Sequence, residues 1–264
     1  MSDGRALART FLEQQRLLGG DPVILADSRT GGQPDGGTGE HAATPHPSAP
    51  PPVRPSASRE LPPPGISFDP PAGDLFSNDP ISQARSVAAV AALVAECTRC
   101  RLCEGRTHTV PGEGPDDARL VVVGEGPGRV EDETGRPFVG PAGELLTKIL
   151  AAIDLPRERV FICNVVKCRP PENRVPQYDE VGACAPYLFR QIELLKPKVI
   201  LAMGGTAAQT LLDTKQSLGA LRNRIHRFRG IPVVVTYHPA ALLRNPHWKR
   251  PTWDDVRTAH RLLA

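Results

Sequence analysis

Apolar residues in the C-terminal two thirds of the chain form short runs that alternate with stretches of helical spacing. The runs predict four buried strands, at 120–123, 160–166, 199–203 and 233–236. Apolar positions three and four residues apart predict helices around them, at 81–96, 142–153, 177–195, 205–212 and 252–263. Alternating strands and helices indicate an α/β fold, a doubly wound three-layer domain with a short, mostly parallel four-stranded central sheet.

The N-terminal third has a different pattern. Residues 1–20 predict a short amphipathic helix, although Gln14 interrupts its apolar face. Residues 21–80 are interpreted as a disordered linker, because the stretch 27–80 holds 13 of the 29 prolines and too little apolar surface to offset its ordering entropy. The folded domain is therefore expected at 81–264. The short helix is either a capping element or a docking site for an unknown partner protein.

Composition and charge narrow the class of protein. No apolar run approaches the roughly eighteen residues of a membrane span, and the N-terminus lacks the apolar core of a secretion signal. We therefore expect a cytoplasmic protein whose six cysteines are reduced. Lys and Arg number 25 against 18 Asp and Glu over 97–264, but 7 against 11 over 1–96. The basic part favours a polyanionic partner.

The cysteines comprise a Cys-x2-Cys pair, a second pair with fifteen residues between its members, and two others. These are Cys97 and Cys100, Cys168 and Cys184, and Cys103 and Cys163. The two pairs could close one site of four thiolates, which suits either a zinc ion or an iron–sulfur cluster. A zinc ribbon usually has two close pairs, and the second pair is wide. Cys103 is a candidate competing ligand, whereas Cys163 lies in an apolar strand and is interpreted as a buried thiol.

A glycine turn follows the first strand, at the edge of the sheet where such folds bind ligands. Gly124, Glu125 and Gly126 open this turn, and glycines let backbone approach a ligand closely. The carboxylates of Glu125 and Glu131 argue against a phosphate site. Acid–base chemistry or a neutral polar ligand fits better, and an ordinary strand–helix turn is the alternative.

Three further residues have both a functional and a structural interpretation. Phe138 either stacks on a planar ligand or packs into the core. Asn164 interrupts an apolar strand, where its amide either reads the edge of a base or bonds to neighbouring backbone. His238 ends the fourth strand, either beside the other strand ends or as a satisfied core residue.

Two leucines follow His238 in a loop-like segment. Leu242 and Leu243, with Arg244 beside them, suit a wedge pushed into a duplex while a cation binds phosphate. A core helix is the alternative for paired leucines.

Together these residues resemble the family 4 uracil-DNA glycosylases, the iron–sulfur branch of the uracil-DNA glycosylase superfamily. The motifs that carry the resemblance are Cys97-Thr-Arg-Cys100-Arg-Leu, Gly124-Glu-Gly-Pro-Gly128, Gly135-Arg-Pro-Phe-Val-Gly140, the stretch 163–174 and His238-Pro with Leu243-Arg-Asn245. The resemblance extends from about Cys97 to the C-terminus.

The resemblance implies a [4Fe–4S] cluster on the two cysteine pairs and a flipped uracil stacked on Phe138. It implies that Asn164 reads the uracil edge, that the 124–126 backbone lines the pocket and that the leucine segment fills the hole in the duplex. His238 would stabilise negative charge on uracil O2. It further implies a monofunctional enzyme, expected to be a monomer near the nucleoid, that excises uracil from single- and double-stranded DNA.

Some positions depart from the better-known branches of that superfamily. Gly126 stands where the best-known branch has a catalytic Asp, so Glu125, Glu131 and Asn173 remain as candidates to activate water. Gly128 stands where that branch has a Tyr that excludes thymine. Arg224-Ile-His226 matches a motif that cross-links to DNA in another branch, but it lies in a different part of the chain. His226 is therefore interpreted as a solvated residue on a short strand.

Overall fold

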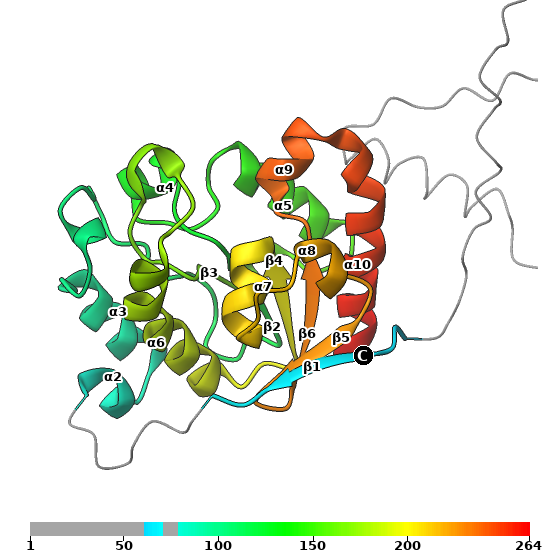
Figure 1. Cartoon of the computed structure of the whole chain (residues 1–264), viewed down its shortest axis with the longest axis horizontal. Helices are drawn as coiled ribbons and strands as arrows, with labels where there is room; N and C mark the ends of the chain where they lie inside the picture. Colours follow the sequence, from blue (N-terminus) through cyan, green and yellow to red (C-terminus); the bar gives the residue numbers. More distant parts are fainter. Residues whose placement is uncertain (1–60, 71–78) are drawn as a thin grey trace, which may run out of the picture.

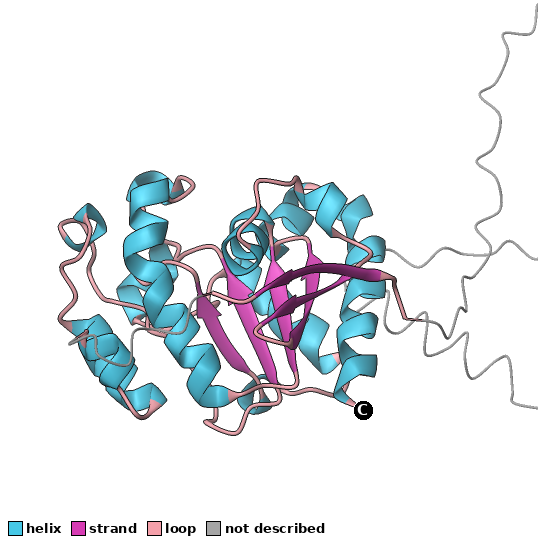
Figure 2. Cartoon of the chain, turned by 60° about the horizontal axis from the view of Figure 1, so that its bottom comes forward, coloured by secondary structure: helices cyan, strands magenta, loops and turns pink. Residues whose placement is uncertain are grey.

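A mixed six-stranded sheet in the order β1-β5-β6-β4-β2-β3 forms the centre of a computed structural model that describes residues 61–70 and 79–264 (Figures 1 and 2). Its strands are β1 (Pro64–Phe68), β2 (Leu120–Gly124), β3 (Phe161–Asn164), β4 (Val199–Met203), β5 (Ile225–Phe228) and β6 (Ile231–Thr236). Strands β6, β4, β2 and β3 are parallel, β5 is antiparallel to β6, and β1 is parallel to β5. The four predicted strands form the parallel part, and the prediction of only four strands is wrong.

Helices lie on both faces of the sheet (Figure 2). They are α2 (Pro80–Gln83), α3 (Val87–Ala95), α4 (Arg129–Thr134), α5 (Pro141–Ala151), α6 (Tyr178–Leu195), α7 (Gly205–Leu212), α8 (Leu218–Leu221), α9 (Pro239–Arg244) and α10 (Lys249–Leu263), with 3-10 turns η1 (Arg101–Cys103), η2 (Arg157–Arg159), η3 (Pro171–Asn173) and η4 (Pro246–Trp248). Among the described residues, no helix has both the length and the apolar character that crossing a membrane requires.

The single helix predicted over 81–96 is wrong, since α2 and α3 are separate. Ala84 has an extended conformation (ψ 125°) that ends α2. The Ser86 hydroxyl then accepts the Ala89 N–H at 3.1 Å and starts α3. A side-chain cap of this kind satisfies a backbone donor that a continuous helix would bond internally.

Alternate residues of each central strand face two different cores. Val121 and Val123 of β2 pack with apolar residues of α3, α6 and α7. Leu120 and Val122 of the same strand pack with α5 and α10 on the other side. A strand buried on both faces reads as a continuous apolar run, which is why the sequence predicts these strands well.

Strand β1 lies inside the segment predicted to be a linker, so the prediction over 21–80 fails at this strand. It is attached to β5 by His226, whose Nδ1 accepts the Ile66 N–H at 2.8 Å and whose Nε2 donates to the Leu221 carbonyl at 2.7 Å. His226 is only 1% exposed, so it is on a short strand as predicted but is not solvated. The predicted helix at 1–20, and the rest of the linker apart from 61–70 and 79–80, lie outside the described residues.

Candidate active site and cysteine cavity

The strand ends bring together four of the residues that the sequence singles out. Gly124 and Asn164 are register partners at the ends of β2 and β3. A Cβ on Gly124 would overlap the Asn164 Oδ1 and lie 2.5 Å from Cζ of Phe138, so only glycine fits there. The Phe138 ring lies 5.4 Å from the His238 ring between centroids, with 32° between their planes. Gly124, Asn164, Phe138 and His238 therefore lie close together near the carboxyl ends of β2 and β3.

Asn164 is the most unusual polar residue of this site. It is 1% exposed, and its Oδ1 is a buried oxygen with no hydrogen-bond partner in the part of the chain that the structure describes. Nearly all buried polar atoms in proteins are paired, because a missing hydrogen bond costs about 1–3 kcal/mol. An unpaired acceptor at the end of a strand is the expected feature of a ligand site. The interpretation of Asn164 as bonded to nearby backbone through this oxygen is therefore excluded.

His238 is held as a neutral donor. Its Nδ1 accepts the Ala240 N–H at 3.2 Å where the chain enters α9, so the ring proton is on Nε2. Burial, assisted by the charge of Arg244 and opposed by that of Glu131, lowers the pKa of His238 to about 4. At neutral pH the ring is uncharged and has an Nε2–H to donate.

The Glu131 carboxylate organises two loops around the site. Its Oε1 accepts the N–H groups of Val139 and Gly140, both at 2.9 Å, and its Oε2 accepts the Gly128 N–H at 3.1 Å. One side chain thus fixes the glycine turn to the loop that carries Phe138. The Glu131 carboxylate is thus occupied in accepting three backbone N–H groups.

The other two candidates to activate water have different surroundings. Glu125 is half-buried and its Oε2 accepts the Thr206 hydroxyl at 2.6 Å. Asn173 is exposed in η3 with a left-handed backbone (φ 56°), and its Oδ1 accepts from Nε of Arg169 at 2.8 Å. Each therefore has a positioned side chain, Glu125 at the glycine turn and Asn173 on the surface.

The leucine segment is helical, and its two leucines have different environments. Leu242 is 1% exposed and packs in the core with α5 and α10, whereas Leu243 is 50% exposed. The prediction that both leucines form a wedge is therefore wrong for Leu242. Leu243 and the exposed Arg244 remain available at the surface of α9.

Five of the six cysteines line one cavity between the N-terminal part of the domain and α6. They are Cys97, Cys100, Cys103, Cys168 and Cys184. Cys163 is fully buried in β3, as predicted, and lies outside this cavity. Within the described residues, no three Cys, His, Asp or Glu side chains form a group that could hold a single metal ion.

Hydrogen-bond donors point at the thiols of the second pair. Nη1 of Arg106 donates to the Cys168 Sγ at 3.3 Å, and the Lys167 N–H donates to the Cys184 Sγ at 3.2 Å. Burial raises the pKa of Cys184 to about 12 and also raises the pKa of Cys168 and Cys100. These thiols are therefore poor nucleophiles toward solvent while no cofactor is bound.

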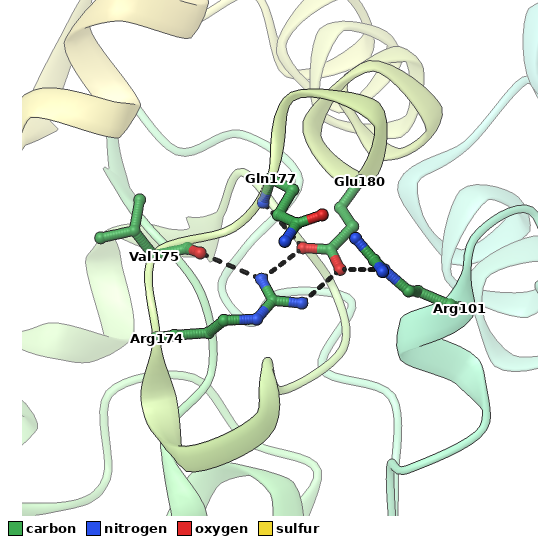
Figure 3. Close-up of polar contacts among 5 residues, drawn as sticks. All are labelled: Arg101, Arg174, Val175, Gln177 and Glu180. Atoms are coloured by element: carbon green, nitrogen blue, oxygen red, sulfur yellow. Dashed lines mark hydrogen bonds and ion pairs between the residues drawn. The ribbon is translucent and has the colours of Figure 1, made fainter.

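An ion-pair cluster forms around the buried Glu180 carboxylate (Figure 3). Its residues come from three segments that each carry a cysteine. The fully buried Glu180 carboxylate accepts from Arg101 at 3.0 Å, from Arg174 at 2.6 and 2.8 Å, and from the Gln177 N–H at 2.7 Å. Arg101 directly follows Cys100, and Glu180 is one turn before Cys184. The hydrogen bond from Arg174 lowers the pKa of Glu180 to about 2, with help from Gln177 and Arg101 against the cost of burial.

Comparison with known proteins identifies the family. The sequence profile of the uracil-DNA glycosylase superfamily matches residues 111–257. The type-4 uracil-DNA glycosylase of Thermotoga maritima is 51% identical over 170 residues, which cover 63% of this chain and 88% of that protein. This chain belongs to the type-4 branch of the uracil-DNA glycosylase superfamily.

Further relatives support this placement within the superfamily. The type-4 uracil-DNA glycosylase of Pyrobaculum aerophilum is 47% identical over 162 residues, or 58% of this chain and 83% of that protein. The type-5 uracil-DNA glycosylase of the same organism is 31% identical over 150 residues, or 50% of this chain and 66% of that protein. The resemblance predicted from the motifs is confirmed.

Packing explains two departures of this type-4 member from the better-known branch. A Cβ on Gly126 would lie 2.7 Å from Cγ2 of Val166, so an aspartate would require Val166 to move. A Cβ on Gly128 would lie 2.8 Å from the Glu131 Oε2. A tyrosine at 128 would therefore displace the carboxylate that holds the two loops.

Three residues of this glycosylase fold were not singled out by the sequence. Glu180 could have been found, since Gln177-x-x-Glu180 at the start of a predicted helix is a capping-box signal. Lys167 also gives a signal, as a charge directly after the apolar pair 165–166; it is 1% exposed and donates to the Asn164 carbonyl at 2.8 Å. Arg157 gives none, because its partners lie 19 and 20 residues away in the loop before α5.

Proposed function

We propose that the protein hydrolyses the N-glycosidic bond of uracil in single- and double-stranded DNA, releasing uracil and leaving an abasic site. The observation that carries this proposal is the unpaired Oδ1 of Asn164, buried at a strand end beside Phe138 and His238. Family membership supplies the substrate class, since the relatives are named uracil-DNA glycosylases.

The Asn164 amide matches the edge of uracil. Its Oδ1 accepts from N3–H of the base, and its Nδ2 donates to O4. Cytosine presents an acceptor at N3 and an amino group at C4, so both contacts would be mismatched. A buried site that leaves two polar groups unpaired rejects the wrong base strongly.

The base must leave the helix before its glycosidic bond becomes accessible. Phe138 provides the aromatic face on which the flipped base stacks, next to His238. Leu243 is the apolar side chain that enters the space left in the duplex, and Arg244 binds a backbone phosphate.

Bond cleavage leaves negative charge on the departing uracil. The Nε2–H of neutral His238 donates to O2, where that charge develops. Water adds to C1′ of the oxocarbenium-like sugar, and its proton ends on the released uracil. Glu125 and Asn173 orient this water, whereas Glu131, whose carboxylate accepts three backbone N–H groups, acts by shaping the pocket.

The cavity cysteines fit a [4Fe–4S] cluster held by Cys97, Cys100, Cys168 and Cys184. All four line one cavity, and two of their sulfurs receive hydrogen bonds, as cluster thiolates commonly do. Fifteen residues separate Cys168 from Cys184, whereas a zinc ribbon usually has two close pairs, so the spacing favours a cluster over a single zinc ion. When bound, the cluster supplies structural cross-links between segments and no redox step in the excision.

Incubation with an oligonucleotide that contains one uracil, followed by alkali, tests the proposed reaction. We expect strand cleavage at the uracil, in single strands and in duplexes with guanine or adenine opposite. The same oligonucleotide with thymine in that position is the control. Tight DNA binding without cleavage would instead indicate a non-catalytic DNA-binding module.

Analysis of the purified protein tests the cofactor. Iron together with absorbance near 400 nm is expected for the cluster. A colourless protein that contains zinc would contradict the proposed cofactor without touching the proposed reaction.

A further inference from the structure

The loop that carries Phe138 has an unfavourable backbone conformation. Phe138 has a φ of +51°, in the left-handed region that non-glycine residues rarely occupy. Such a conformation persists only where the surroundings enforce it, and it is frequent where a side chain must be aimed at a ligand. Here it turns a 5% exposed ring toward Gly124 and His238.

One arginine binds both carbonyls at this turn. Arg157 of η2 donates from Nη1 to the Phe138 carbonyl at 2.8 Å and from Nη2 to the Pro137 carbonyl. A planar guanidinium can bond two neighbouring oxygens at once, which the single ammonium of lysine does less well. The Phe138 carbonyl also lies so close to α5 that a Cβ on Gly143 would overlap it.

The remaining polar groups of the turn are bound from the opposite side. Glu131 accepts the N–H groups of the next two residues, Val139 and Gly140. Arg157 thus holds the carbonyls of 137 and 138 while Glu131 holds the amides of 139 and 140. The turn is enclosed by two charged side chains, and Arg157 also lies just before β3, the strand that ends at Asn164.

The nearby carboxylate of Glu113 does not compete with the loop carbonyls for the Arg157 guanidinium. Burial is the main influence on Arg157 and lowers its pKa, with further effects from Glu113, Arg136, Glu158 and Glu131. Glu113 already forms a two-bond ion pair with Arg136, at 2.7 and 2.9 Å. An arginine side chain in a protein remains protonated. The N–H groups of the Arg157 guanidinium can therefore always donate to the two carbonyls.

We infer that Arg157 is a positioning residue that holds the left-handed turn at Phe138 and so presents the aromatic ring to the flipped base before the base arrives. The inference rests on the proposed function, because it names the ligand of Phe138 as uracil. Arg157 itself touches no reacting atom. Its effect is on how well the site is organised for stacking.

The first test compares Arg157→Lys with wild type in three measurements. We expect kcat/KM for uracil excision to fall about 10- to 100-fold, as for a displaced positioning group. We expect inhibition by free uracil to weaken by a similar factor. The Kd for an abasic oligonucleotide should change less than about twofold, because that ligand has no base to stack. Free-uracil inhibition at the wild-type level in Arg157→Lys would overturn the inference.

Arg159→Lys is the matched control, since Arg159 is exposed on the same 3-10 turn. We expect it to leave inhibition by free uracil unchanged. A weakening equal to that of Arg157→Lys would show that any exchange of arginine for lysine on this turn has the effect, independent of the two bonds to the loop, and would overturn the inference.

A second measurement needs no variant. In the wild-type protein without ligand, the amides of 139 and 140 should exchange slowly with solvent, since the turn is already formed. Exchange as fast as in an unstructured peptide would contradict a preformed turn. If the wild-type protein excises no uracil, the proposed function fails, while this measurement still decides whether the turn is held.

Discussion

The candidate uracil site and the cysteine cavity are held together mainly by different kinds of contact. In the pocket, Glu131 and Arg157 bind backbone N–H and C=O groups, so the loops themselves are fixed. Around the cavity, Glu180 binds the side chains of Arg101 and Arg174 as well as one backbone N–H, and the sulfurs come from segments far apart in the chain.

This difference suggests a division of roles. Backbone contacts give a pocket whose shape is complete within the polypeptide, as base reading requires. Side-chain ion pairs connect segments that a cofactor can then cross-link. Changes in the pocket should therefore reduce activity at nearly constant stability, and changes around the cavity should first reduce stability.

The largest effect is expected from Asn164→Asp. The carboxylate cannot donate to O4 and opposes the negative charge that develops on the base. We expect kcat/KM for uracil excision to fall on the order of 10³-fold. Asn223→Asp, the same change at an exposed position, is the control. If the melting temperature of Asn164→Asp falls as much as that of Cys184→Ser, the loss of activity results from unfolding and not from the changed base contact.

Cys184→Ser tests the cavity. We expect loss of iron and a decrease in the free energy of unfolding of about 3 kcal/mol or more, because a bound cofactor stabilises only the folded state. Iron analysis and thermal unfolding measure both. Cys103→Ser changes a thiol in the same cavity and should retain the iron. Loss of iron in the Cys103 variant would mean that Cys103 is a cluster ligand in place of one of the four proposed cysteines.

Glu180→Gln should have an intermediate effect on stability. The amide loses the charge that two arginines bind, at a cost of about 1–3 kcal/mol, since both arginines are partly solvated. The pKa of Glu180 in the folded protein is about 2, below its ordinary value of 4.5. The carboxylate therefore stabilises the fold fully above pH 4.5, and this contribution disappears as the pH falls toward 2.

Denaturant unfolding of both proteins across that pH range measures the difference. Wild type and Glu180→Gln should converge in acid. Glu133→Gln removes an exposed ion pair with Arg129 and should cost less than about 0.5 kcal/mol. A pH-independent difference for Glu180→Gln would mean that packing, and not charge, explains its cost.

The smallest effect is expected at the far edge of the sheet. His226→Leu removes the acceptor of the Ile66 N–H and should cost about 1 kcal/mol at pH 7. Burial lowers the pKa of His226 below 6.5, so its contribution is complete above 6.5 and is lost as the pH falls below that value. The difference between variant and wild type should therefore shrink at pH 5.

Exchange of the Ile66 amide is the local measurement for this prediction. It should accelerate in His226→Leu and remain unchanged in His260→Leu, where the histidine is exposed on α10. Uracil excision should be unaffected in both. An accelerated exchange in the His260 variant would mean that β1 is not attached through His226.

The local pattern of apolar and polar residues was sufficient to predict the parallel part of the sheet and to single out the motif residues. Strands β2, β3, β4 and β6 are continuous apolar runs, and a run buried on both faces needs no partner to be recognised. It was not sufficient for β1, which begins at the last of three consecutive prolines, 62–64. This strand forms because β5 provides an edge to pair with and His226 provides an acceptor.

The sequence by itself determined the family, the parallel strands, the cysteine pairs and the residues Gly124, Phe138, Asn164 and His238, because these depend on local chemistry and spacing. Only the tertiary structure decided which leucine is exposed, which nitrogen of His238 holds the proton and which arginine fixes the Phe138 turn. Leu242 and Leu243 are chemically identical, and only packing against α5 and α10 distinguishes them. Burial and hydrogen bonding between distant segments are properties of the fold, and no window of sequence contains them.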